Sequence, residues 1–577
     1  MKKIRLLSLV LATVLVCLCL STCAKHPDKA HEPLTIITGC KDYTEFEKEF
    51  KKVYPEVQLR FISYSGYNTT SYLNRLLEEG AIPDIYTLTV LPDEELQKKY
   101  LIDLSGYDFS ARYAVSRLSE CSVEGAVYML PSNYAVLGIY YNKTLFEKYG
   151  WQVPTSFAEM EALVPKIREA GVEVSTAELE PIGCAFQYLF NLGDTVFLRT
   201  PEGLDWIEQF FNGEVTADTA WESTVAYMQK WIDLGLINGD WYGKTSREAE
   251  AHFAEGNTAF FITGEAFRFS QNEDGSGDRY GLMPWLSEDG SNNRYITHTS
   301  CYYGLNANLG RTNNKQKLED ALKFMSFIST EKGQQLLPGS SQQMLLPLTG
   351  TEMAQDENYR DIIDMLNAGY GAPLTYRGWE NLIVPIGKAC MEWYAGRSTG
   401  DQTIAVMNHT MQNLLQDETG ALAYLPRDLT QEETAQLVGE AFAAAVGADC
   451  ALISLGGYHE GKENEFGVNG RLFDGVVDDV TISTINPLGW VDTIRTFTLT
   501  GKEIRQLAKE GFDRHHDGNP FPYVLTVAPD TKLNNEKQYT VVICGCTDEV
   551  RARGKEQNTG VSGMDALHDY FENSQKE

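Results

Sequence analysis

Residues 34–62 read LTIITGCKDYTEFEKEFKKVYPEVQLRFI, and this stretch decides the fold of the first part of the chain. Its first five residues, LTIIT, predict a buried strand. Phe46, Phe50 and Val53 recur at i, i+4 and i+7, which places them on one face of a helix. The proline that follows ends that helix, and residues 57–62 alternate in polarity as a second strand does.

The residues that come next repeat this alternation of strand and helix. We predict a helix over 68–79, with Gly80 as its C-cap, and a third strand over 84–88. Strand, helix, strand, helix, strand at this spacing predicts parallel βαβ units and an α/β fold with a doubly wound sheet. Ligands of such sheets bind beyond the carboxyl ends of the strands, so the loops there are the first place to seek binding residues.

The N-terminus has the pattern of an export signal. Residues 6–20 are apolar, without charge or proline, and as a helix would rise about 22 Å, short of the roughly 30 Å hydrocarbon core. We therefore expect a signal peptide over 1–23. LSTC, ending at Cys23, resembles a bacterial lipobox, although Thr22 stands where Gly, Ala or Ser is usual. The resemblance implies lipidation of Cys23, a tether over 24–33 and a place at the extracellular face of the cell membrane. Cleavage with free secretion is the alternative.

Composition narrows the classes of function. A length of 577 residues predicts several domains. The net charge of −31 argues against nucleic acid as a partner, because little in the chain would neutralise phosphates. After the leader no run is long and apolar enough to cross a bilayer. The cysteines form no CxxC pair, so their spacing predicts no zinc site.

Several segments resemble, in their order and spacing, family 1 extracellular solute-binding proteins of the maltose-binding type, which serve ABC importers. The matching segments are FEKEFKKVYPEVQLRF (46–61), IPDIY (82–86), VYMLPS (127–132), GIYYNK (138–143), LFEKYG (145–150), VPTSF (153–157), NTAFFITGE (257–265), GLMPW (281–285) and KLEDALKFMSFISTEKGQQLL (317–337). The resemblance covers residues 34–425. Each segment alone is common, whereas their succession is specific.

This resemblance implies a two-lobed periplasmic-binding-protein-like type II fold over residues 34–427, whose lobes close on a ligand by hinge motion. It implies a sugar or oligosaccharide as ligand and the permease subunits of an ABC importer as partners. The chain has no GxSxG, HExxH or GxxxxGK[ST] motif. We therefore expect a binding protein that is not an enzyme and that uses no cofactor and no metal.

Candidate ligand residues are aromatic and polar side chains in loops that follow strands. Sugar sites stack aromatic faces on pyranose rings and add a few polar groups for orientation. The predicted set is Lys41, Asp42, Tyr64, Tyr67, Asn133, Tyr134, Glu265, Phe267, Trp285, Tyr376 and Trp379. Glu265 stands where the family usually has a small polar residue. The alternative for each ring is ordinary packing in the core or on the surface.

A second domain is predicted over residues 428–577. TQEE at 430–433 is a capping box that opens a helix, and Gly447 ends this helix. An apolar strand and the Gly-rich turn LGGYH (455–459) follow. This succession resembles the C-terminal domain of 5′-nucleotidases, and so do the later segments TINPLG (484–489), TLTGKEIRQL (498–507), YTVVI (539–543) and NTG (558–560). The similarity covers residues 428–573.

This domain differs from the 5′-nucleotidases at residues that bind their substrate and in the part that carries out their reaction. Where those enzymes have an Asn, this chain has Ser454. Where they have an Arg that helps to hold the substrate, this chain has His459. Phe521 and Tyr523 lie near the segment that carries a base-stacking ring. The dimetal phosphatase half is absent from the chain, and the nine histidines are dispersed, so we expect no phosphate ester hydrolysis. Nucleoside binding, nucleotide scavenging and a surface-interaction role remain open for this domain.

Overall fold

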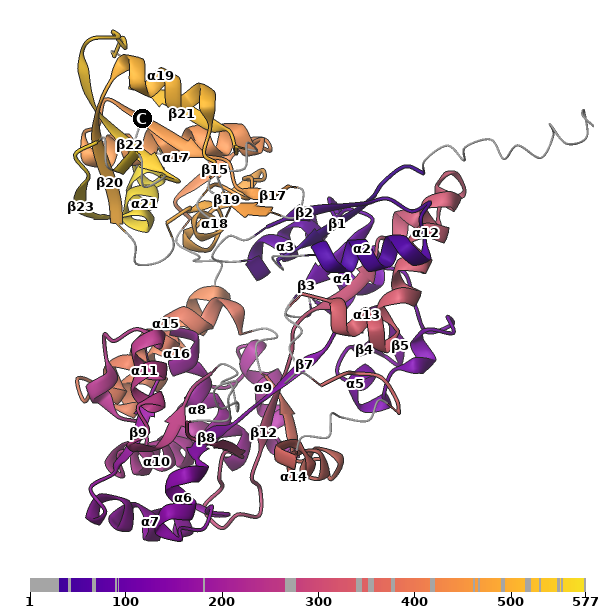
Figure 1. Ribbon diagram of the computed structural model, residues 1–577, viewed down its shortest axis with the longest axis vertical. Coiled ribbons are helices and arrows are strands. Elements are labelled where there is room, and N and C mark those ends of the chain that lie inside the picture. The colour runs from indigo at the N-terminus through magenta and orange to yellow at the C-terminus, as the bar shows by residue number, and fades with distance from the viewer. Residues whose placement is uncertain are drawn as a thin grey trace, which may run out of the picture.

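The computed structural model describes three bodies: two lobes and a C-terminal domain (Figure 1). The described residues are 31–39, 43–64, 69–88, 91, 93–179, 182–264, 277–338, 345–350, 357–374, 379–415, 421–459, 462–464, 467–488, 493–513, 520–528, 531–546, 550–551 and 554–574. Within these residues, none of the helices combines the length and the apolar composition that a bilayer crossing needs. The predicted signal peptide, Cys23 and most of the tether lie outside the described residues.

Lobe one is built on a five-stranded sheet of order β2-β1-β3-β13-β6. Its strands are β1 (Leu34–Thr38), β2 (Leu59–Ser63), β3 (Ile85–Leu88), β6 (Met129–Pro131) and β13 (Tyr302–Leu305). β1 pairs in parallel with both β2 and β3, which confirms the predicted βαβ units. β13 runs antiparallel to β3 and to β6.

The helices of lobe one cover this sheet. They are α2 (Thr44–Val53), α3 (Thr69–Glu78), α4 (Glu94–Tyr100), α5 (Val115–Ser119), α12 (Lys315–Ile328) and α13 (Glu331–Leu336). Phe46 and Phe50 of α2 are buried and pack on Phe324 and Phe327 of α12. Val53 was predicted to share their face, but 55% of it is exposed, because α2 ends there and its last turn extends past the core.

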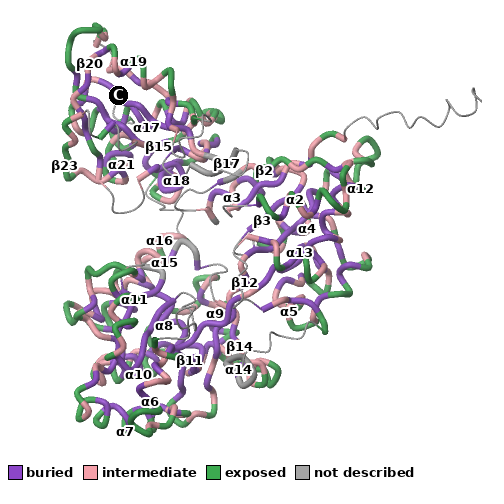
Figure 2. Tube along the Cα trace, in the orientation of Figure 1, coloured by how far each residue is buried: buried purple, intermediate pink, exposed green. Residues whose placement is uncertain are grey.

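Lobe two is built on a four-stranded sheet of order β11-β8-β10-β9. Its strands are β8 (Ile139–Asn142), β9 (Glu173–Ala177), β10 (Thr258–Ile262) and β11 (Tyr280–Met283). Its main helices are α6 (Lys143–Tyr149), α7 (Phe157–Glu169), α8 (Ile182–Val196), α9 (Pro201–Phe211), α10 (Asp218–Asp233), α11 (Ser246–Ala254), α15 (Glu380–Tyr394) and α16 (Gly400–Leu415). The strands of both lobes are buried, while the outer helices expose one side (Figure 2).

A three-stranded sheet of order β14-β12-β7 joins the lobes. β7 (Tyr134–Leu137) and β12 (Tyr295–Thr299) pair antiparallel, and β14 (Gly371–Pro373) pairs with β12. β7 leads from β6 of lobe one to β8 of lobe two, and β12 leads back to β13. The crossing strands predicted from the family resemblance are therefore present.

The C-terminal domain has a five-stranded mixed sheet of order β21-β16-β22-β20-β23. The strands are β16 (Cys450–Ser454), β20 (Thr493–Thr500), β21 (Tyr523–Val527), β22 (Gln538–Cys544) and β23 (Gln557–Ser562). The helices α17 (Gln431–Val446) and α21 (Gly563–Ser574) bury one face of the sheet, and α19 (Gly501–Glu510) the other. The predicted capping box at Thr430 is confirmed, as is the C-cap at Gly447, whose φ is 63°.

The chain enters this domain earlier than the sequence suggests. β15 (Ala423–Leu425) falls within the predicted solute-binding range 34–427, yet it pairs with β19 (Gly475–Val477) of the C-terminal domain. The domain also contains α18 (Asp479–Ile485) and the hairpin of β17 (Gly457–His459) with β18 (Lys462–Asn464).

Candidate functional site

The carboxyl edges of the two lobe sheets adjoin the region between the lobes. β6 ends at Pro131 on the same edge of lobe one at which β1 and β2 end, because both β6 and β3 run antiparallel to β13. β8 begins at Ile139, beside the last residue of β10, Ile262. The short β7 therefore connects the two carboxyl edges, which is where α/β sheets bind ligands.

Asn133, at the start of the crossing, is fully buried and bonded inside the protein. Its Nδ2 donates to the Gln334 carbonyl oxygen at 3.1 Å, and its Oδ1 accepts from the Ser300 hydroxyl at 2.9 Å. These bonds tie the β6–β7 junction to α13 and to the β12–β13 junction. The prediction that Asn133 contacts ligand is corrected, because its side chain is fully buried and has no exposed surface.

Tyr134, the next residue, keeps part of its side chain accessible. The Arg117 guanidinium lies 4.5 Å from the centre of its ring, a distance at which a cation and an aromatic face attract each other. Tyr134 opens β7, so its ring lies at the start of a strand that crosses between the lobes. Of the five predicted ligand residues whose side chains the structure describes, Tyr134 is the one that is not fully buried.

Charged side chains from both lobes flank the hinge. In lobe one, Arg117 Nη2 lies 2.7 Å from Glu120 Oε1, and in lobe two Arg199 Nε lies 2.9 Å from Asp194 Oδ1. Arg199 also donates to the Pro373 carbonyl oxygen of β14 at 2.9 Å. Burial raises the pKa of Glu120 to about 7 against the opposing attraction of Arg117 and Arg199.

Lobe two places a buried polar group at its carboxyl edge that sequence reasoning missed. Glu178 directly follows β9, is 4% exposed, and accepts hydrogen bonds from the Thr263 hydroxyl and, at 3.8 Å, from Cys184 Sγ. A Cβ at Gly264 would lie 2.7 Å from Cys184 Sγ, so a larger residue there would require neighbouring side chains to shift. An acidic residue immediately after a predicted strand is the signal that could have identified Glu178.

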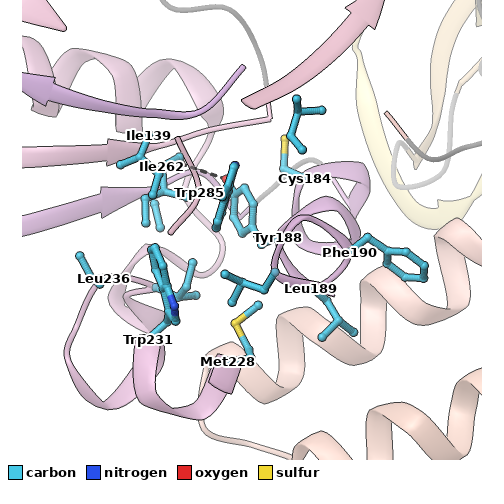
Figure 3. Close-up of a cluster of buried hydrophobic side chains, with 14 of the residues drawn as sticks. Ile139, Cys184, Tyr188, Leu189, Phe190, Met228, Trp231, Leu236, Ile262 and Trp285 are labelled. Carbon is cyan, nitrogen blue, oxygen red and sulfur yellow. Dashed lines mark hydrogen bonds between the residues drawn. The ribbon is translucent and has the colours of Figure 1, made fainter. Parts of the chain in front are cut away.

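Trp285 is a correction to the predicted ligand set. It is fully buried, and its ring lies 5.5 Å from that of Trp231 and 5.8 Å from that of Tyr188. Figure 3 shows it within the cluster of buried side chains of lobe two, beside Ile262. A ring enclosed by other rings has no face for a sugar, so packing explains this tryptophan.

Trp379 is a second correction, for the same reason. It is 1% exposed at the start of α15 and is surrounded by aromatic rings of lobe two. Those rings are Phe186, Phe190, Trp206, Phe210 and Phe211. This cluster joins α8, α9 and α15 and belongs to the same core as Trp285.

Tyr64 is the third correction. It follows β2, as predicted, but it is 1% exposed, and its hydroxyl donates to the Thr484 carbonyl oxygen of the C-terminal domain. Its ring stacks on Tyr72 of α3 with 4.0 Å between the centroids. The side chain therefore joins two domains instead of meeting a ligand.

The other predicted residues fall outside what the structure describes. They are Lys41, Asp42, Tyr67, Glu265, Phe267 and Tyr376, together with the side chain of His459. Among the described residues, no three His, Cys, Asp or Glu side chains gather so that they could hold a metal ion.

Two α/β lobes joined by paired crossing strands at their carboxyl edges define the class of two-lobed binding proteins. The family model of the bacterial extracellular solute-binding proteins matches residues 42–335, about half of the chain. The chain belongs to this family of extracellular solute-binding proteins.

Curated relatives are similar over part of their length. An uncharacterized ABC transporter extracellular-binding protein of Pyrococcus horikoshii is 27% identical over 243 residues, which cover 38% of this chain and 51% of that protein. The multiple sugar-binding protein of Streptococcus mutans serotype c is 27% identical over 175 residues, covering 29% of this chain and 41% of that protein. The chain thus spans about half the length, or less, of these relatives.

Solved structures share the fold. A family 1 extracellular solute-binding protein from Bifidobacterium longum subsp. infantis aligns with a TM-score of 0.53 at 17% identity, over 67% of this chain and 100% of that one. A binding protein from Bacillus subtilis subsp. subtilis str. 168, solved in an open conformation, aligns with a TM-score of 0.55 at 15% identity, over 68% and 99%.

Proposed function

We propose that this protein captures a small carbohydrate between its lobes and delivers it to an ABC importer. The observation that carries the proposal is the pair of α/β sheets connected at their carboxyl edges by β7 and β12, in a chain of the solute-binding family. The choice of carbohydrate is supported by the name of the Streptococcus mutans relative and by RafE, a protein of the same fold solved with raffinose (TM-score 0.52, 18% identity).

Capture needs no reaction in this mechanism. The lobes close about the hinge sheet, and water leaves the polar groups at both carboxyl edges as the ligand takes its place. Tyr134 supplies an aromatic surface beside the crossing, held by Arg117. The closed, liganded form is what the permease subunits of the importer would recognise.

The protein is held at the extracellular face of the membrane in this proposal, through a lipid on Cys23. The support is the LSTC sequence after an apolar leader. A net charge of −31 on the whole chain would keep the body of the protein away from an anionic membrane surface.

We assign residues 428–577 a non-catalytic role as a domain similar to the C-terminal half of 5′-nucleotidases. The assignment is supported by the order of elements: capped helix, strand β16 and then a Gly-rich turn. Ser454, at the place of the enzymes' Asn, is fully buried, and its hydroxyl donates to the Leu455 carbonyl oxygen at 3.2 Å. Nucleotide scavenging is the alternative, and no observation among the described residues favours it.

A thermal-shift assay on the full chain tests the proposal. Raffinose, stachyose and adenosine are the probes. A ligand at 100 times its Kd stabilises the native state by about 2.7 kcal/mol, so a raised Tm reports binding. We expect a sugar to raise the Tm, and Tyr134→Ala to reduce that shift. Tyr424→Ala, at an exposed site on β15, is the control. Stabilisation by adenosine and by neither sugar would overturn the proposal.

A further inference from the structure

The C-terminal domain packs on lobe one through an aromatic ring. Phe473 is 7% exposed and belongs to the hydrophobic cluster that also contains Tyr64 and Tyr72 of lobe one. Its ring centroid lies 6.1 Å from that of Tyr72. The Tyr64 hydroxyl donates to the carbonyl oxygen of Thr484 in α18. We call this contact, formed by Tyr64 and Tyr72 with Phe473 and Thr484, the dock.

Two arginines, one from each domain, flank the ring of Phe473. The guanidinium of Arg471 lies 4.5 Å from the ring centroid, and that of Arg75 in α3 lies 5.8 Å from it. Arg75 Nη2 also donates to the Asp474 carbonyl oxygen at 2.8 Å. The dock therefore combines buried apolar surface with directed hydrogen bonds and cation–π contacts, which together define one position of the domain on lobe one.

The backbone of the C-terminal domain approaches the rings of the dock closely. A Cβ at Gly470 would lie 2.9 Å from Cε2 of Tyr64 and 3.0 Å from Cε2 of Tyr72. Both rings are buried, and they stack with 4.0 Å between their centroids. A larger residue at position 470 would therefore push against the stacked pair and separate the two surfaces of the dock.

The dock lies at the edge of lobe one that is farthest from the hinge. In the sheet order β2-β1-β3-β13-β6, the crossing strand β7 follows β6, and β2 is the opposite edge strand. Four strand spacings separate β2 from β6, which is about 19 Å. Tyr64 directly follows the carboxyl end of β2, and β17 of the C-terminal domain contacts β2 (Figure 1). The carboxyl edge of lobe one thus ends at the hinge on one side and at the dock on the other.

The C-terminal domain also borders the space between the lobes. A groove of about 720 Å³ is lined by side chains from all three bodies. They include Asn74 and Arg75 of α3 in lobe one, Thr410 and Asn413 of α16 in lobe two, and Asp474 and Val476 of the C-terminal domain. The domain therefore faces both lobes at the β2 side of the molecule and does not lie on an outer surface of lobe one.

We infer that the C-terminal domain forms the end of the solute site and limits the length of the saccharide that the lobes can enclose. The inference rests on the proposed function, in which the solute lies along the carboxyl edges. A saccharide that begins beside Tyr134 at the hinge can follow the carboxyl edge of lobe one for about 19 Å before it meets the dock. A longer chain collides with the C-terminal domain, and such a clash is a means of rejecting a wrong ligand. Short oligosaccharides are therefore the substrate class.

Isothermal titration calorimetry on the full chain tests the inference with two matched pairs of sugars. The pairs are raffinose with its longer homologue ajugose, and maltotriose with maltoheptaose. The compared chains are the parent, Gly470→Val and the control Gly106→Val, where an added Cβ meets nothing within 4 Å. Hydrogen exchange of the α3 and α18 amides reports whether the dock has opened. Phe473→Ala, which removes the ring without adding volume, replaces Gly470→Val if that chain does not fold or its dock stays closed.

We expect the parent to bind the short member of a pair more tightly than the long one by about tenfold, which corresponds to 1.4 kcal/mol. Opening the dock should remove most of this preference by raising the affinity for the long sugar, while Gly106→Val keeps it. Equal affinity of the parent for both lengths would overturn the inference alone, as would an unchanged preference after the dock has opened. Absence of binding by all four sugars to every chain would overturn the proposed function and this inference with it.

Discussion

Gly138→Ala tests how closely the backbone is packed at the point where the crossing strand β7 enters lobe two. Gly138 lies between β7 and β8, and a Cβ there would come closer than 3.0 Å to the carbonyl oxygen of Met283. Met283 is the last residue of β11, paired with Ile139, so its carbonyl is held by the sheet. Ordinary contact starts near 3.4 Å, so one strand must move by about an ångström to restore it.

Forcing an added methyl group into a packed site costs about 1–3 kcal/mol. We expect the upper end here, because the obstacle is backbone and not a flexible side chain. For a unit of 150–250 residues each kcal/mol lowers the Tm by about 2–4 °C, so the expected fall is about 6–12 °C.

Tryptophan fluorescence during heating reports the unfolding of lobe two. Every described tryptophan lies in the lobe-two core or packs against it. Gly106→Ala is the control, because an added Cβ there meets nothing within 4 Å, and it should leave the Tm unchanged. Equal melting of Gly138→Ala and Gly106→Ala would refute the steric reasoning at the hinge.

Two further predictions follow from burial. Glu120 has its pKa raised by burial from 4.5 to about 7, so the native state binds the proton more tightly than the unfolded chain does. Its contribution to stability is present below pH 4.5 and is lost as the pH rises to 7, up to about 3 kcal/mol, and urea titrations should show that Glu120→Gln lacks this decline. Trp285→Ala should lower the free energy of unfolding by about 3–5 kcal/mol, because it empties a core site, whereas Tyr134→Ala should cost less; similar urea midpoints for the two variants would contradict this.

The local predictions that the structure confirms concern residues that lie close together in the chain. The capping box between Thr430 and Glu433 and the left-handed Gly447 depend on neighbours within one turn of helix, so the sequence alone reveals them. The same holds for Phe46 and Phe50, whose spacing is the period of a helix. The family resemblance added the crossing strands, which no local rule predicts.

The candidate site could be predicted less well, because a position after a strand does not determine whether an aromatic ring points into the core or toward a ligand. Trp285 and Trp379 follow or adjoin strands and loops of the right kind, yet both turn into the lobe-two core. Glu178 is not among the predicted residues, although its carboxylate lies at the carboxyl edge of lobe two.

What the sequence by itself determined is the succession of strands, helices and caps, and through its family resemblance the two-lobed plan, because these depend on periodicity and on contacts between near neighbours. Only the tertiary structure decided that Tyr64 meets Thr484, 420 positions away, and that Arg75 and Arg471 both lie over the ring of Phe473. The physical reason is that a buried ring takes its place from whichever surfaces close around it, and those surfaces come from parts of the chain that no local pattern connects.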